Sequence, residues 1–179
     1  MLLNRTLIAF GWSSASPSRY DLIRELLHFG PEGVDVNKIF PMESDHPLFR
    51  YFTDEERNRI ESIGAVKRIA DGAYLIRAGE IDSTLFAVED GHLDIIGIDD
   101  GKTVVVATVG PGDVLGEVSF IDDSPRAVSV KAGEETTVRS WDKRTLSEAL
   151  AFDPQLLAKF GVAMSELLVE RLRDMSRRV

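Results

Sequence analysis

The chain has 179 residues, of which 44% are hydrophobic, which is enough to bury the core of one ordinary domain with short appendages. Its 30 acidic residues outnumber its 21 lysines and arginines, and the formal net charge of −9 at pH 7 argues against a bulk attraction to DNA, RNA or anionic lipid. Because it has no cysteine, disulfide bonds, cysteine-ligated metals and thiol catalysis are excluded.

The N-terminal residues 1–45 are predicted to form an appendage that precedes the main domain. The apolar run from Leu7 to Trp12 is short for a signal peptide and follows Asn4 and Arg5, so we expect a cytoplasmic protein. Nowhere do about 18 apolar residues follow one another, so no membrane span is predicted.

An amphipathic helix is predicted between Ser16 and Gly30. Tyr20, Ile23 and Leu26 recur on one face, and Gly30 ends the run. This helix either packs against the rest of the protein or docks on a partner or a second protomer, and the residues leave both interpretations open.

The main domain is predicted to span residues 46–152. Thr53 followed by Glu56 has the form of a capping box, which predicts a short helix over about Asp54 to Ser62. From Val66 to Trp141 the pattern changes to short β runs separated by turn residues every eight to twelve positions. The predicted strands are Val66–Ile69, Ala73–Arg77, Thr84–Asp90, His92–Asp99, Thr103–Val109, Ala127–Ala132 and Thr136–Asp142.

This spacing of strands is typical of a small double-sheet β roll. The Asp100-Gly101 pair between two alternating runs gives the clearest hairpin signal of the chain. The fold is therefore predicted to be α+β and mainly β: an eight-stranded, jelly-roll-like β roll with flanking N-terminal helices and a C-terminal helix.

A long helix is predicted over residues 153–179. Leu146 and Leu150 indicate a turn of helix, and Asp153-Pro154 then supplies the cap and first-turn proline of the longer one. Its apolar stripe, which most often means core contact, comprises Leu156, Leu157, Phe160, Met164, Leu167, Leu168, Leu172 and Met175. The basic cluster Arg171, Arg173, Arg177 and Arg178 is interpreted as favourable charge at the helix C-terminus rather than as a nucleic-acid contact.

The stretch from Leu115 to Val130 has the chemistry of an anion-binding cradle. Gly116 allows close backbone approach, and residues 118–121 can form one helical turn with free N–H groups at its start. Arg126 adds a fixed fork of donors that suits a phosphate, whereas Glu117 suits a hydroxyl-bearing part of the same ligand. A phosphate and a sugar hydroxyl together indicate a nucleotide.

A simpler interpretation makes Arg126 a surface arginine paired with Asp122 or Asp123, and Glu117 a solvated side chain. Gly116, Pro125 and Ala127 have no reason to accompany such a surface pair. A related hypothesis is that the two aspartates hold Arg126 while the site is empty.

Two short runs within this stretch resemble the phosphate-binding cassette of cyclic nucleotide-binding domains, as in protein kinase A regulatory subunits and the catabolite activator protein. They are Gly116-Glu117-Val118-Ser119-Phe120 and Ser124-Pro125-Arg126-Ala127-Val128. The resemblance implies that Glu117 binds the ribose 2′-hydroxyl and that Arg126 binds the cyclic phosphate. It also implies that the backbone amides of Ser119 and Ala127 complete the cradle.

The resemblance extends to other parts of the chain. It implies that Ile95, Val106 and Ala107 lie along the sugar and base pocket, although plain roll core is an equally simple interpretation of the three. The C-terminal helix is expected either to cover the base as a lid or to pair with its twin in a homodimer. Ala127 stands where a threonine accompanies cyclic GMP preference, so the resemblance favours cyclic AMP.

Other functional classes lack their motifs. The three histidines are scattered without metal-ligand spacing, and neither a nucleophile elbow nor a nucleoside-triphosphate loop is present, so no metal, cofactor or enzymatic activity is predicted. The prediction is a non-catalytic cyclic nucleotide sensor that binds cyclic AMP, less favourably cyclic GMP, and signals to an unidentified protein effector through its C-terminal helix. The alternative is a degenerate fold that acts as a ligand-free interaction or dimerisation scaffold.

Overall fold

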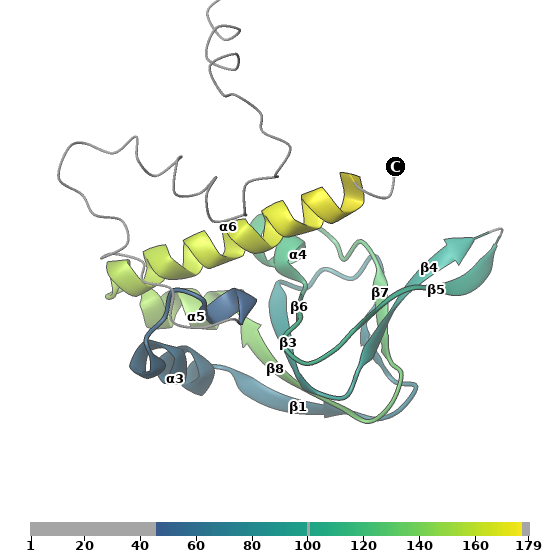
Figure 1. The fold of residues 1–179 in the computed structure, drawn as a ribbon, viewed down its shortest axis with the longest axis horizontal. Helices are drawn as coiled ribbons and strands as arrows, with labels where there is room; N and C mark the ends of the chain where they lie inside the picture. The colour runs from purple at the N-terminus through teal and green to yellow at the C-terminus, as the bar shows by residue number, and fades with distance from the viewer. Residues whose placement is uncertain (1–45, 100, 177–179) are drawn as a thin grey trace, which may run out of the picture. The chain divides into compact units, whose positions relative to one another are not determined.

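The computed structural model of the protein describes residues 46–99 and 101–176 (Figure 1). The helix predicted between Ser16 and Gly30, and the end of the basic cluster at Arg177 and Arg178, lie outside these residues. The helices are η1 (Pro47–Phe49), α3 (Asp54–Ile63), α4 (Glu117–Asp122), α5 (Lys143–Leu150) and α6 (Pro154–Ser176). The strands are β1 (Ala65–Ile69), β2 (Tyr74–Ile76), β3 (Thr84–Asp90), β4 (Leu93–Asp99), β5 (Lys102–Val109), β6 (Val114–Leu115), β7 (Ser129–Ala132) and β8 (Thr136–Asp142).

The eight strands of the described residues form two four-stranded antiparallel sheets, which confirms the predicted double-sheet roll. One sheet has the order β1-β8-β3-β6 and is called here the inner sheet, because it lies between the helices and the other sheet. The outer sheet has the order β2-β7-β4-β5. The predicted hairpin is confirmed by the pairing of Asp99 with Lys102 across the turn that joins β4 to β5.

Two strand predictions need correction. β7 begins at Ser129 rather than at Ala127, because residues 127 and 128 still belong to the turn that carries the cassette. β6 was not predicted, since two residues are too few to show an alternating pattern. It nevertheless pairs with β3 through Leu115 and Phe86, and it thereby places the start of α4 beside β3.

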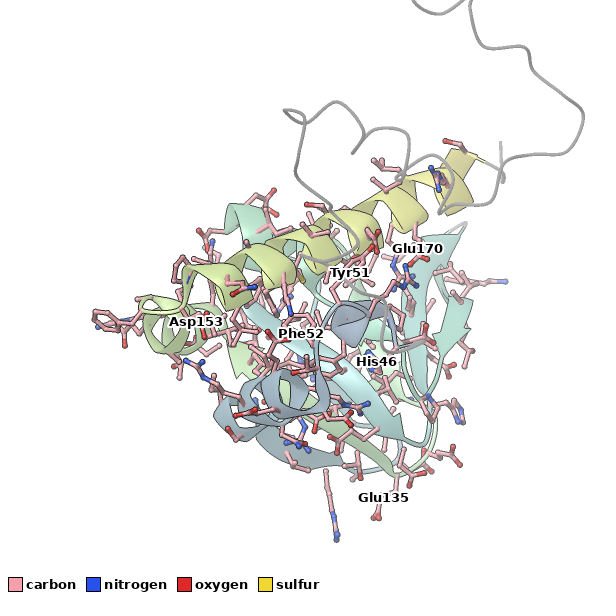
Figure 2. The ribbon with its side chains drawn as sticks, turned by 60° about the vertical axis from the view of Figure 1, so that its left-hand side comes forward. His46, Tyr51, Phe52, Glu135, Asp153 and Glu170 are labelled. Atoms are coloured by element: carbon pink, nitrogen blue, oxygen red, sulfur yellow. The ribbon has the colours of Figure 1, made fainter. Side chains whose placement is uncertain are left out.

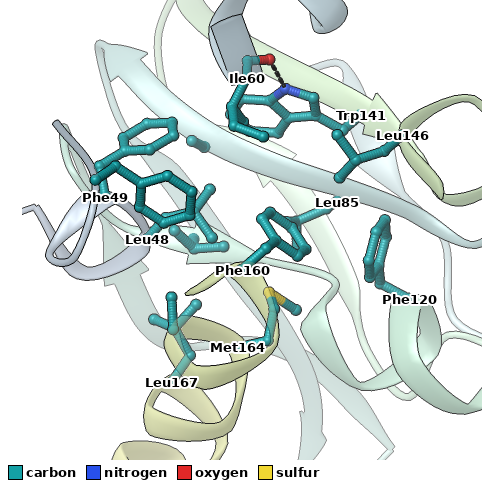
Figure 3. Packing of buried hydrophobic residues seen from close by; sticks show 14 of the residues in the cluster. Leu48, Phe49, Ile60, Leu85, Phe120, Trp141, Leu146, Phe160, Met164 and Leu167 are labelled. Carbon is teal, nitrogen blue, oxygen red and sulfur yellow. Dashed lines mark hydrogen bonds between the residues drawn. The ribbon is translucent and has the colours of Figure 1, made fainter. Parts of the chain in front are cut away.

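The inner sheet is apolar on both faces. On the face toward the outer sheet, Phe86 and Val138 pack with outer-sheet residues such as Leu93 and Val130. On the opposite face, the sheet packs against the helices in a second core (Figure 3). This second core contains Leu48, Phe49, Phe52, Ile60, Leu85, Ala87, Val114, Phe120, Trp141, Leu146, Leu150, Leu156, Phe160, Ala163, Met164 and Leu167.

The helix starts follow the signals in the sequence. Thr53 and Glu56 form the predicted capping box at α3, with both reciprocal hydrogen bonds present. Asp153 accepts a hydrogen bond from the Leu156 amide at 3.0 Å and so caps α6, whose first residue is Pro154. No helix among residues 46–99 and 101–176 combines the length and apolar character that crossing a membrane requires.

Ion pairs fix the N-terminal half of α6, residues 154–166, to residues 46–53, which are called here the entry segment. Arg50 contacts Glu166 at 3.0 Å, and both side chains are buried. Lys159, also buried, contacts Glu56 of α3 at 2.6 Å. Figure 2 shows Tyr51, whose hydroxyl donates to Glu166, lying beside α6. The entry segment, α3 and this half of α6 are therefore held together by charge as well as by apolar packing.

Candidate functional site

Gly116 is the residue around which the predicted cradle closes. Its φ of +84° lies in the left-handed region, where glycine is favoured, and it is the N-cap of α4. A Cβ atom there would lie 2.3 Å from Nη1 of Arg126 and 2.8 Å from the carbonyl oxygen of Thr84. The groups that approach this glycine closely in the structure are Arg126 and the β3 backbone.

The backbone of Arg126 is fixed by the turn between β2 and β3. Its N–H donates to the carbonyl of Glu80 at 2.8 Å, and its own carbonyl accepts from the amide of Gly79 at 2.8 Å. This reciprocal pair holds the cassette against a segment more than 40 residues earlier in the chain. The side chain therefore starts from a defined backbone position.

The guanidinium of Arg126 is buried, with the residue only 4% exposed. Its Nη2 donates to the Thr84 carbonyl and to the Asp82 carboxylate, each at 2.6 Å, and Nη1 donates to the Gly116 carbonyl at 3.2 Å. Its Nε is buried and has no hydrogen-bond partner among the described residues. A buried charged donor without an acceptor is costly, so the arrangement suits a ligand that brings an anionic acceptor.

The proposed pairing of Arg126 with Asp122 or Asp123 is wrong, and so is its description as a surface arginine. Asp122 accepts from the Ser124 amide at 2.9 Å, while Asp123 accepts from Lys143 at 2.6 Å. The acid that holds Arg126 is Asp82. Closeness in sequence suggested the wrong partner for Arg126, because Asp122 and Asp123 make their hydrogen bonds at the C-terminal end of α4 instead.

The environment of Asp82 keeps its carboxylate ionised. Partial burial opposes ionisation, but hydrogen bonds from Thr84 and Arg126 outweigh it and hold the pKa of Asp82 below its ordinary value of 3.8. The side chain is 44% exposed, so water still reaches this edge of the site. Arg126 is therefore paired with an anion even without a ligand, and that anion, Asp82, lies at the edge of the site that water reaches.

Glu117 is the first residue of α4, and it is only 9% exposed rather than solvated. Its Oε1 lies 3.5 Å from Nε of Arg171, which comes from α6. The same guanidinium donates through Nη2 to the carbonyl of Val114 at 2.9 Å. Arg171, predicted only as charge at a helix end, thus connects the C-terminal helix to the cradle.

The other cassette residues divide by burial. Ser119 is buried, whereas Val118, Pro125 and Ala127 are exposed. In the resembling family a leucine and a glycine are common where this chain has Phe120 and Asp123. The two replacements fit locally: Phe120 packs on Phe160 of α6, and Asp123 ends α4 with a positive φ of 57°, which aspartate tolerates better than most residues.

The residues predicted to line the sugar and base pocket come together on β4 and β5. Ile95 lies directly opposite Ala107, and an irregularity in the ladder leaves Val106 beside this pair. A Cβ on Gly97 would lie 2.7 Å from a methyl group of Val106, which explains the glycine. Ile95 also packs on the core between the sheets, so the core interpretation holds for that residue.

A second cation lies near the ring that Arg126 covers. Lys67 of β1 pairs with Val138 and so shares its face of the inner sheet, the face toward the outer sheet. Its Nζ lies 5.6 Å from the Phe86 ring centroid, and Cζ of Arg126 lies 5.7 Å from the same centroid. The sequence prediction missed Lys67, although the alternation of side chains along β1 places it on the same face as Ile69, which packs between the sheets.

No group of three or more His, Cys, Asp or Glu residues in the described part of the chain is arranged to hold a metal ion. The charged groups gathered here are the guanidiniums of Arg126 and Arg171 and the carboxylates of Asp82 and Glu117. They suit an anionic ligand with hydroxyl groups.

Comparison with known proteins agrees with this chemistry. Residues 66–152 match the family model described as cyclic nucleotide-binding domain. The chain is 30% identical to a cGMP-dependent protein kinase of Plasmodium berghei, over 78% of this chain and 17% of the relative. It is also 30% identical to a cAMP-dependent protein kinase regulatory subunit of Colletotrichum orbiculare, over 58% of this chain and 26% of the relative.

A solved structure supports the likeness in three dimensions. A cyclic nucleotide-binding domain from Methylobacillus flagellatus superposes with a TM-score of 0.68 at 26% identity, covering 79% of this chain and 78% of that one. The chain spans only about a sixth to a quarter of the length of the two curated relatives. The similarity therefore concerns one domain of those proteins.

Proposed function

We propose, on the premise that residues 66–152 belong to the cyclic nucleotide-binding domain family, that this protein is a non-catalytic regulatory sensor of a cyclic nucleotide. The observation that carries the proposal is the buried guanidinium of Arg126, whose Nη1 lies against Gly116 and whose Nε has no acceptor among the described residues. A cyclic phosphate supplies an anionic acceptor of the right kind at this point.

The roles within the site follow the cassette. Arg126 binds the phosphate through donors that Asp82 and two carbonyls do not use, and the amides of Ser119 and Ala127 add contacts. Glu117 accepts from the ribose 2′-hydroxyl. Ile95, Val106 and Ala107 supply apolar contact along the sugar and base, with Val106 half exposed and available to a ligand.

Cyclic AMP is the proposed ligand, because Ala127 stands where a threonine accompanies cyclic GMP preference. The relatives are named for both nucleotides, so their names favour neither. Competition binding that favours cyclic GMP would overturn this choice.

Nucleotide binding is proposed to be transmitted to an effector by a movement of α6. A ligand moves a helix only through contacts that differ between two states, and Arg171 supplies such a contact by reaching Glu117 from α6. The exposed side chains of Val169 and Leu172 on the same helix suit a protein effector or a second copy of the chain. The cytoplasmic location remains a prediction from the sequence.

A thermal-shift screen of the full chain with cyclic AMP, cyclic GMP and cyclic dinucleotides tests the proposal. Saturation to 100 times the Kd stabilises a protein by about 2.7 kcal/mol, so the melting temperature should rise by roughly 5–10 °C. Glu117→Gln should reduce the shift, whereas the exposed Glu148→Gln on α5 serves as a control that leaves it unchanged.

One observation favours the scaffold as the second candidate. Both charged cassette residues already have partners within the chain, Arg126 with Asp82 and Glu117 with Arg171. If no cyclic nucleotide raises the melting temperature of the wild-type chain, the sensor proposal fails and the scaffold takes its place.

A further inference from the structure

We propose that the free edge of β5 is an interaction surface and that its partner is β5 of a second copy of this chain, in an antiparallel pair about a two-fold axis. The outer sheets of the two copies then join into one continuous sheet. The contact involves neither α6 nor the cassette. The proposal does not depend on the proposed function, since it holds for a sensor and for a scaffold alike.

β5, Lys102–Val109, is an edge strand of the outer sheet. Within residues 46–99 and 101–176, it hydrogen-bonds to β4 on one side, and no strand pairs with its other side. Every second residue of such a strand directs its N–H and C=O away from the sheet, where they can pair with another extended chain. Val105 and Val106 are 55% and 50% exposed, and Figure 1 shows the hairpin of β4 and β5 extending away from α3 and α5.

The other three sheet edges have features that keep edges from pairing. β1 carries two consecutive cations, Lys67 and Arg68, while β2 has only three residues and β6 only two. β5 has eight residues, and none of them beyond Lys102 at its start is charged. Its irregularity at Val106 bends a strand but adds no charge. Within the described part of the chain, β5 is therefore the edge that is most open to a further strand.

The charges of the chain favour a second copy as the partner. Two copies with a net charge of −9 repel each other, so they meet most easily at an edge without acidic residues, such as β5. In an antiparallel pair centred on Val105, valine, threonine and alanine side chains lie opposite one another. Lys102 then lies opposite Thr108 of the other copy, and the two lysines are at opposite ends. The edge is thus complementary to itself.

A two-fold pair of this kind also ends at two copies. Each copy uses its β5, and the other edge of the outer sheet, β2, has only the three residues Tyr74–Ile76. A third copy has no comparable edge to pair with, so the expected assembly is a closed dimer rather than a fibre. Because one pair of strands buries little surface, we expect this dimer to dissociate on dilution.

Sedimentation velocity of the full chain without nucleotide, over a range of concentrations, tests the proposal. The wild-type chain should pass from monomer to dimer as its concentration rises. Val105→Lys should weaken the dimer at least about tenfold, because it places like charges beside the two-fold axis. The same substitution lowers the net negative charge, so an effect of general repulsion between copies would go in the opposite direction.

Val66→Lys is the matched control. Val66 is 53% exposed in the edge strand β1, close to the 55% of Val105, and the change in net charge is the same. It should leave the dimer unchanged, and so should Leu172→Lys on the exposed side of α6. Ligand-free melting curves check that each variant is folded. If Val105→Lys is not, Thr103→Lys on the same edge carries the comparison.

Hydrogen exchange locates the contact within the dimer. At concentrations that favour the dimer, alternate amides of residues 102–109 should exchange more slowly than in dilute solution, because every second N–H points to the partner. Three results would overturn the proposal: a monomer at every concentration, an equal effect of Val105→Lys and Val66→Lys, or a dimer that only Leu172→Lys dissociates. The first leaves the edge to an extended segment of another protein, and the last places the contact between copies on α6.

Discussion

Arg126 is predicted to stabilise the empty fold as well as to bind a phosphate. Arg126→Ala removes donors from the carbonyls of Thr84 and Gly116 and from the carboxylate of Asp82. Because Asp82 is 44% exposed, water replaces its lost partner, and this pair contributes only about 0–1 kcal/mol. The two carbonyls lose charged donors, each worth about 1.5–3 kcal/mol, so we expect a total loss of about 3–7 kcal/mol.

Urea unfolding followed by tryptophan fluorescence measures this loss without any nucleotide. Trp141 is buried beside α3, where its environment reports on the core. Arg126→Lys should fall between wild type and Arg126→Ala, because a lysine keeps the charge but cannot reach all three acceptors in the fork geometry. Arg144→Ala is the control: its side chain is 86% exposed, and its loss should stay within about 0.5 kcal/mol.

A loss for Arg126→Ala no larger than that for Arg144→Ala would refute this reasoning, because the buried contacts would then contribute nothing to folding. A large loss also changes how binding experiments are designed. Absence of binding by Arg126→Ala is informative only under conditions in which that variant is shown to be folded. Arg126→Lys is then the better variant for affinity.

Three other predictions concern the fold. Burial, followed by the charge of Arg57, lowers the pKa of His46 below 6.5, and the neutral ring accepts a hydrogen bond from the Leu48 amide. Since the unfolded chain then binds a proton more readily than the folded one, stability should fall as pH drops below about 6.5. His46→Asn should flatten this pH dependence in melting curves. Trp141→Phe should cost about 1–3 kcal/mol in urea unfolding, because it leaves a carbonyl of α3 unpaired. Gly116→Ala should cost about 1–3 kcal/mol by the same measurement, since its φ is positive and Arg126 fills the space.

Most of the roll could be predicted because its signals are local. Thr84–Asp90 and Thr136–Asp142 match the observed strands at both ends, since a short β-favouring run with turn residues on both sides identifies a strand within its own sequence. The capping residues Thr53 and Asp153 work in the same way. β6 was missed because its two residues owe their strand geometry to pairing with β3 rather than to any local pattern.

The site could be predicted only where its residues are close in sequence. Glu117 and Arg126 stand ten positions or fewer from Gly116 and were found from the cassette. Asp82 and Arg171 were missed, because their contacts to Arg126 and Glu117 are made by the tertiary fold across 44 and 54 positions. The nearer acids at the end of α4 suggested the wrong partner for Arg126, since sequence distance says little about which buried charges meet.

The distribution of charge along α6 indicates where a nucleotide can act on it. From its start to just past its midpoint, the buried pair of Arg50 with Glu166 and the part-buried pair of Lys159 with Glu56 tie the helix to the entry segment and α3. Breaking one buried pair costs about 3–5 kcal/mol, more than the roughly 1–3 kcal/mol of coupling that a ligand commonly supplies. Beyond this half, the more exposed Arg171 joins the helix to the cradle. We therefore expect the nucleotide to displace the C-terminal turns of α6, while its first half stays with the entry segment as one body.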